Sequence, residues 1–144
     1  PNGVRIIDDC YNANPISFGN ALKAFQALEC EGRKILVFAD MLELGKEEDH
    51  YHYELGQAIM AAQIPYALAY GEKTQFSIDA IQQAKANCSA VYFQDPKQLT
   101  VSLLEILRPG DAVLFKGSRS MHVEKVLMAV QEAFLQNTAD QKKR

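Results

Sequence analysis

The sequence D-D-C-Y-N-A-N-P-I-S, from Asp8 to Ser17, follows a short apolar run and precedes a helical pattern. It therefore predicts a turn between a strand and a helix. Asn14-Pro15 marks the start of the helix, because proline has a preset φ and the asparagine before it can accept a capping hydrogen bond. Capping accounts for Asn14 and Ser17, but not for two adjacent carboxylates, a phenol and a second carboxamide. The additional polar groups indicate a binding site on this turn.

Short apolar runs alternate with amphipathic helical patterns along the rest of the chain. The clearest run, K-I-L-V-F-A at 34–39, has no polar alternation, which is typical of a strand buried on both faces. This pattern predicts an α/β fold, a Rossmann-like three-layer sandwich with a mostly parallel sheet of five to six strands and helices on both faces. We predict strands at 4–8, 34–39, 66–70, 90–93 and 112–116, and a last helix that begins at Gly117-Ser118.

The composition indicates one soluble globular domain of 144 residues with a formal net charge of −3. This charge predicts neither a nucleic-acid partner nor an anionic membrane surface, and no apolar run approaches the length of a membrane span. The cysteines Cys10, Cys30 and Cys88 are odd in number and widely spaced, which favours reduced thiols in a cytoplasmic protein.

We expect an ordered domain over residues 1–136 and a disordered tail over residues 137–144. The chain opens on Pro1-Asn2-Gly3, a turn signal without an initiator methionine, and we interpret it as a fragment of a longer protein.

Unusual polar residues fall at the carboxyl ends of three predicted strands. Parallel α/β sheets bind ligands at this edge, so the three turns are expected to converge. Carboxylates suit a metal-bound nucleotide or a ribose hydroxyl, and basic groups suit phosphate or carboxylate. The residues are Asp8, Asp9, Tyr11, Asn12 and Asn14 after the first strand, Asp40 and Glu43 after the second, and Lys116, Ser118 and Arg119 after the fifth.

The sequence lacks both G-x-x-x-x-G-K-[ST] and G-x-G-x-x-G, so the chain cannot hold a nucleoside triphosphate in the usual manner by itself. The string K-G-S-R at 116–119 has the wrong order for a P-loop, although its predicted place at a helix N-terminus would favour an anion. His50 and His52 are two residues apart on a predicted helix and point to different sides. We therefore predict no metal site in this chain.

Three strings resemble the signatures of the C-terminal domain of the Mur ligases. They are D-D-C-Y-N-A-N-P-I-S, A-D-M-L-E-L-G at 39–45 with His52 following, and K-G-S-R-S-M-H-V-E at 116–124. The resemblance covers the chain from about Gly3 to Gln136. Within the family, Y-N-A-N-P and D-M-L-E-L-G are similar to the members that join D-alanyl-D-alanine to UDP-N-acetylmuramoyl-tripeptide in peptidoglycan synthesis.

The resemblance implies an ATP- and Mg²⁺-dependent reaction, in which a terminal carboxylate is phosphorylated and an incoming amine attacks the acyl phosphate. The central domain of the family carries the P-loop and binds most of the ATP and Mg²⁺. The C-terminal domain closes over the nucleotide and helps to bind D-alanyl-D-alanine. The resemblance therefore implies that this chain works with the N-terminal and central domains of a monomeric, cytoplasmic ligase and is inactive alone.

The resemblance also assigns roles to the residues, none of them catalytic within this chain. Asp40 has a second interpretation, as an N-cap for the turn that follows it. The assigned residues are Asp9, Tyr11, Asn12 and Asn14 for the nucleotide; Lys116, Ser118 and Arg119 for the dipeptide carboxylate or the developing phosphate charge; and Asp40, Glu43 and His52 for loop ordering.

A phosphoacceptor receiver domain is the alternative from another class. It is also a five-stranded α/β unit with an acidic pair after its first strand and a lysine after its fifth, which Asp8-Asp9 and Lys116 imitate. A receiver carries its acceptor aspartate after the third strand, whereas Asp40 follows the second predicted strand and Tyr70-Gly71 follows the third. A non-catalytic binding domain, the remaining alternative, leaves Y-N-A-N-P and K-G-S-R unexplained.

Overall fold

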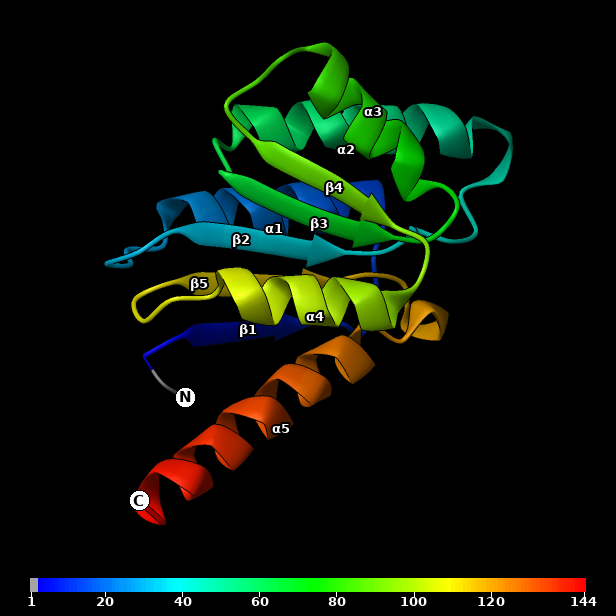
Figure 1. Cartoon of the computed structure of the whole chain (residues 1–144). Helices are drawn as coiled ribbons and strands as arrows, with labels where there is room; N and C mark the ends of the chain where they lie inside the picture. The colour runs from blue at the N-terminus through cyan, green and yellow to red at the C-terminus, as the bar shows by residue number, and fades with distance from the viewer. Residues whose placement is uncertain (1–2) are drawn as a thin grey trace.

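The computed structural model describes residues 3–144, so Pro1 and Asn2 of the predicted opening turn lie outside the described residues. Strands and helices alternate along the chain (Figure 1). The strands are β1 (Arg5–Asp9), β2 (Lys34–Phe38), β3 (Tyr66–Tyr70), β4 (Ser89–Phe93) and β5 (Ala112–Lys116). The helices are α1 (Pro15–Ala27), α2 (Glu48–Ala61), α3 (Thr74–Gln83), α4 (Pro96–Ile106) and α5 (Val123–Lys142), with 3₁₀ turns at Gly45–Glu47 and Arg119–Met121.

All the strand pairs in the sheet are parallel, and the strand order is β1-β5-β2-β3-β4. Helices α1, α2 and α3 cover one face, while α4 and α5 cover the other (Figure 1). The predicted Rossmann-like sandwich is confirmed, with five strands in the described residues.

The apolar runs of β2 and β5 follow from their positions inside the sheet. In β2, Leu36 and Phe38 pack into the core beneath α1–α3, whereas Ile35 and Val37 pack into the core beneath α4 and α5. Every residue of β5 is buried, including Lys116 at its end. Strands covered on both faces have no solvent side on which a polar residue could alternate.

The topology creates a crevice at the carboxyl end of β5. The segments that leave β1 and β2 lead to α1 and α2 on one face, whereas the segment that leaves β5 leads to α5 on the opposite face. Ligands of open α/β sheets bind where neighbouring connections diverge in this way. The three predicted polar turns therefore share one edge of the sheet.

The last helix differs from the prediction at both of its ends. It begins at Val123 rather than at Gly117-Ser118, because residues 119–121 form a 3₁₀ turn and His122 adopts a left-handed conformation with φ 57°. It continues to Lys142, through most of the segment expected to be a disordered tail, although its last buried residue is Phe134. Within residues 3–144, no helix combines the length and hydropathy that a membrane crossing demands.

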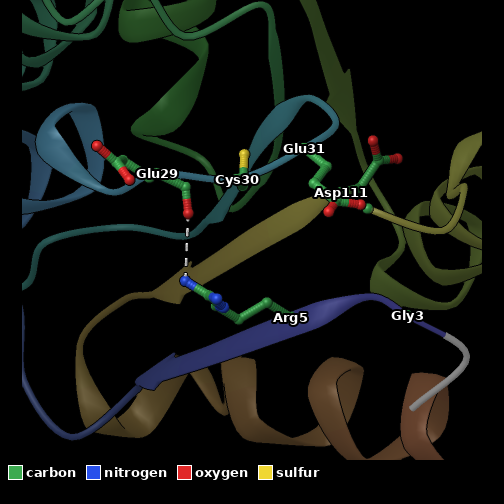
Figure 2. A pocket seen from close by; sticks show the side chains of 7 residues that line it. Gly3, Arg5, Glu29, Cys30, Glu31 and Asp111 are labelled. Carbon is green, nitrogen blue, oxygen red and sulfur yellow. Dashed lines mark hydrogen bonds between the residues drawn. The ribbon is translucent and has the colours of Figure 1, made fainter.

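A hollow of about 430 Å³ lies at the other end of the strands, beside the amino ends of β1 and β5 (Figure 2). There the guanidinium of Arg5 donates a hydrogen bond to the carbonyl oxygen of Glu29 at 3.4 Å. None of the polar residues predicted for the site borders this hollow, which is lined by Gly3, Arg5, Glu29, Cys30, Glu31, Gly110 and Asp111.

Candidate functional site at the carboxyl edge of the sheet

The hydroxyl of Ser118 joins the three loops that follow β1, β2 and β5. It accepts a hydrogen bond from the backbone N–H of Leu42 at 2.8 Å and donates one to the carbonyl oxygen of Ala13 at 3.4 Å. Its own backbone N–H donates to the carbonyl oxygen of Asp40 at 3.1 Å. The predicted convergence of the three turns is therefore present in the structure.

Lys116 connects the end of β5 to the loop after β1. Its ammonium nitrogen lies 2.8 Å from a carboxylate oxygen of Asp9 and 3.1 Å from the carbonyl oxygen of Asn12. The lysine side chain is 1% exposed, whereas the side chain of Asp9 is 41% exposed. The ion pair thus has a buried cation and a carboxylate that faces outward.

Asn14 and Ser17 form the capping box of α1. The amide oxygen of Asn14 accepts from the Ser17 N–H at 2.8 Å, and the Ser17 hydroxyl accepts from the Asn14 N–H at 3.1 Å. The amide oxygen of Asn12 accepts from the N–H of Ala13 at 2.8 Å. Both asparagines therefore use their oxygens to shape the loop, as the turn chemistry predicts.

Tyr11 and Arg119 are exposed side chains at this edge. The guanidinium of Arg119 lies 5.5 Å from the ring centroid of Tyr11, which is 76% exposed. Arg119 also borders a hollow of about 420 Å³ that an anionic or polar ligand could enter. The hollow is lined by Asn12, Leu42, Glu43, Ser118, Arg119, Ser120 and His122.

Asp40 is buried and caps α3. One carboxylate oxygen accepts from the backbone N–H groups of Lys73 and Thr74, both at 3.0 Å. Burial raises the pKa of this carboxyl group, although the two N–H donors oppose the shift. Asp40 therefore caps a helix from a distant part of the chain rather than the turn directly after it.

His52 is fully buried and forms a hydrogen bond with the loop after β2. Its Nε2 accepts from the N–H of Met41 at 3.0 Å, and its Nδ1 lies 2.7 Å from the carbonyl oxygen of Glu48. These partners require a neutral ring with its hydrogen on Nδ1. Glu43, in the same loop, is exposed and adopts φ 62°, which places it in the left-handed region.

The structure gives no support to the receiver alternative. Asp40 is 5% exposed and already accepts two hydrogen bonds, so it is not open to a phosphoryl donor. At the end of β3, the hydroxyl of Tyr70 donates to the carbonyl oxygen of Met121. The string at 116–119 also does not lie at the N-terminus of α5, so the predicted preference for an anion there does not arise from that helix.

The cysteines do not contribute a nucleophile to this edge. All three are free thiols, as predicted. Burial, assisted by the neighbouring carboxylate of Asp8, raises the pKa of the Cys10 thiol, and burial raises the pKa of Cys88 to about 11. Neither thiol therefore ionises readily near neutral pH.

Sequence reasoning missed two residues that border the hollow, Ser120 and His122. Both lie within the string K-G-S-R-S-M-H-V-E, but they were assigned no role there, and the left-handed conformation of His122 depends on the 3₁₀ turn before it. It also missed Leu42 and Ala13, which take part through backbone groups that any residue carries.

Most of the chain matches a known family of domains. The family profile described as "Mur ligase, glutamate ligase domain" matches residues 1–119. The chain belongs to the Mur ligase family. The family indicated by the three strings is thus confirmed.

Two relatives of this Mur ligase domain are named UDP-N-acetylmuramoyl-tripeptide–D-alanyl-D-alanine ligase. The Bacillus subtilis (strain 168) protein is 34% identical over 126 residues, which cover 88% of this chain and 28% of that protein. The Escherichia coli (strain K12) protein is 35% identical over 130 residues, covering 88% of this chain and 27% of that protein. The Mur ligase domain therefore spans about 28% of the length of such relatives.

Solved structures agree with this assignment of the fold. The MurF ligase from Thermotoga maritima in complex with ADP superposes with a TM-score of 0.76 at 27% identity, covering 94% of this chain and 30% of that one. MurF from Acinetobacter baumannii superposes with a TM-score of 0.82 at 25% identity, covering 92% and 29%.

Proposed function

We propose that this chain is the C-terminal domain of an ATP-dependent ligase that joins D-alanyl-D-alanine to UDP-N-acetylmuramoyl-tripeptide in peptidoglycan synthesis. One observation carries the proposal: an outward-facing carboxylate, Asp9, and an exposed cation, Arg119, lie on loops that Ser118 joins. The names of the bacterial relatives support the choice of substrates.

In such a ligase, the terminal carboxylate of the tripeptide takes a phosphoryl group from ATP and ADP is released. The amine of the dipeptide then attacks the acyl phosphate, and inorganic phosphate leaves as the peptide bond forms. We infer that Asp9, with Tyr11, Asn12 and Asn14 around it, contacts the ribose side of the nucleotide. Arg119 meets the dipeptide carboxylate or the charge that develops on phosphate, because a guanidinium can bind either one bidentately.

We propose that the magnesium ion is bound mainly outside this domain. Among residues 3–144, no three histidine, cysteine, aspartate or glutamate side chains gather closely enough to hold a metal ion. Mg²⁺ bound through ATP phosphates needs only one or two protein carboxylates, and we assign these to the central domain of the ligase. We further propose that the ligase is a cytoplasmic monomer, since the cytoplasm supplies its ATP.

We predict that this chain alone releases no ADP from ATP, the tripeptide precursor and D-alanyl-D-alanine, because it lacks a phosphate-cradling loop. Mixing it with a separately made N-terminal and central fragment is expected to restore ADP release that depends on the dipeptide. The covalently joined ligase serves as the positive control. ADP release by the chain alone, or a joined ligase that ignores D-alanyl-D-alanine, would contradict the proposal.

We predict that Arg119→Ala in the full-length ligase weakens the use of D-alanyl-D-alanine. Loss of one charge-assisted contact costs about 1.5–3 kcal/mol, equivalent to roughly a 10- to 150-fold lower kcat/KM for the dipeptide. Steady-state kinetics with the dipeptide varied at saturating ATP measures this effect. An unchanged dipeptide KM together with an unchanged rate would remove Arg119 from the site.

A further inference from the structure

Lys116 and Arg119 are cations in one short string, but their surroundings differ. The ammonium of Lys116 is enclosed by the Asp9 carboxylate, the Asn12 carbonyl and the ring of Phe18, whose centroid is 5.6 Å away. The guanidinium of Arg119 lies beside the ring of Tyr11 and borders the hollow, whereas Lys116 does not line it. A ligand could thus meet Arg119 without any rearrangement, but could reach Lys116 only after these three contacts broke.

The three contacts of the Lys116 ammonium come from β1 and the segment that follows it. Asp9 is the last residue of that strand, Asn12 follows in the turn, and Phe18 belongs to α1. Lys116 also pairs with Asp9 in the register of β1 and β5. One buried ammonium therefore contacts β1, the turn after it and α1 at the same time.

The ion pair leaves Asp9 with one oxygen engaged. Lys116 contacts Oδ2, and no group within residues 3–144 donates a hydrogen bond to Oδ1. A charge-assisted hydrogen bond holds the carboxylate in a defined orientation, and a half-satisfied carboxylate can still accept from a ligand hydroxyl. Lys116 thus fixes the direction in which the open oxygen of Asp9 points.

We propose that Lys116 is a positioning residue for the nucleotide side of the site and does not contact the dipeptide. Its ammonium holds the loop from Asp9 to Asn14 in the conformation that accepts a nucleotide, and Arg119 is the cation of the string that meets the anionic substrate. The proposal rests on the proposed function for the identity of the two ligands, but the loop ordering itself does not depend on it.

The kinetic test compares Lys116→Met with Arg119→Met in the full-length ligase, because each variant removes one positive charge from the same string. Lys116→Met is expected to raise the KM for ATP about tenfold, the effect of one charge-assisted contact, and to leave the KM for D-alanyl-D-alanine within about twofold. Arg119→Met is expected to raise the KM for D-alanyl-D-alanine and to leave the KM for ATP within about twofold. A Lys116→Met variant with a raised dipeptide KM and an unchanged ATP KM would overturn the proposal.

A double-mutant cycle adds a readout that a general loss of stability would not imitate. If Lys116 acts through Asp9, then Asp9→Ala combined with Lys116→Met raises the KM for ATP no further than Asp9→Ala alone. If Lys116 contacts a ligand directly, the two effects multiply, and the proposal fails.

Hydrogen exchange on the chain itself separates this inference from the proposed function. Lys116→Met is expected to speed exchange in residues 9–14 while the amides of β2 and β3 stay protected. Arg119→Met removes only a surface contact with the exposed ring of Tyr11 and is expected to change exchange in residues 9–14 far less. If Lys116→Met does not fold, Asp9→Ala provides the same test, because it removes the same ion pair while the Asn12 carbonyl still accepts from the buried ammonium. Unchanged exchange in residues 9–14 overturns the positioning role, even if the ligase reaction is established.

Discussion

Replacing Asp111 with alanine is expected to lower the free energy of unfolding by about 3 kcal/mol, the lower end of the range for breaking a buried ion pair. Asp111 is 1% exposed and accepts four hydrogen bonds. Its partners are the backbone N–H and guanidinium of Arg33 and the backbone N–H of Arg108. The cost lies at the lower end because the Arg33 side chain is 24% exposed and keeps some contact with water.

Urea denaturation of the chain measures this loss, and Asp79→Ala is the matched control. Asp79 is exposed on α3, so its replacement should change stability by less than about 0.5 kcal/mol. Equal stabilities of the two variants would show that the Arg33–Asp111 pair does not stabilise the fold. Asp111→Asn should fall between them, because it keeps the shape but turns an amide toward the donors of Arg33.

The contribution of Asp111 should also depend on pH. Burial opposes its ionisation, but the hydrogen bonds from Arg33 and Arg108 outweigh burial, so the pKa of Asp111 lies below its usual value. A carboxyl group with a lowered pKa in the folded state stabilises fully above its unfolded pKa of about 3.9. The stability difference between the native chain and Asp111→Ala should therefore be constant near neutrality and shrink as the pH falls below about 4.

The sheet could be predicted from the sequence because its central strands carry a local signal. The uninterrupted apolar run in β2 indicates burial on both faces, and the structure places this strand between β5 and β3. The position of β5 beside β1 had no such signal, because strand order depends on how the connecting helices pack rather than on the composition of a strand. The edge at which the polar turns meet was still predictable, since it follows from parallel strands alone.

The roles of individual site residues were less predictable, because their partners are distant in sequence. Lys116 pairs with Asp9 across 107 positions, and Asp40 caps a helix whose Thr74 is 34 positions away. No local pattern distinguishes a buried lysine from the exposed Arg119 three residues later. By contrast, the capping role of Asn14 was readable, because its partner Ser17 lies within the same turn.

Replacing His52 with alanine is expected to cost about 3 kcal/mol of unfolding free energy, because it combines a cavity with the loss of buried hydrogen bonds. The fully buried ring accepts from the Met41 N–H at 3.0 Å and, from Nδ1, donates to the Glu48 carbonyl at 2.7 Å. Without the ring, the Met41 N–H loses its acceptor in a segment where Met41 itself is 1% exposed. Loss of the ring affects the Glu48 carbonyl less than the Met41 N–H, because this carbonyl lies in the first turn of α2.

His50→Ala is the natural control, since His50 lies two residues earlier on the same helix and its side chain is 65% exposed. Its contact with Glu54 is a surface pair, so its removal should cost no more than about 0.5 kcal/mol. His52→Gln should recover part of the loss, because its amide can accept from Met41 and donate to Glu48. Recovery by His52→Gln but not by His52→Met, which is similar in size, would identify the hydrogen bonds, rather than the volume of the ring, as the stabilising feature.

His52→Ala should also affect the candidate site, through the loop after β2. Met41 adjoins Leu42, whose N–H donates to the Ser118 hydroxyl, and Ser118 in turn contacts Ala13. A loop that loses its anchor at Met41 should weaken this junction, so hydrogen exchange at Leu42 should rise in His52→Ala and fall back in His52→Gln. Thermal denaturation with exchange measured well below the midpoint separates local loosening from global unfolding. His52→Ala could instead speed exchange at Leu42 by no more than it speeds exchange in the core strands. In that case His52 stabilises the fold as a whole and does not order the site.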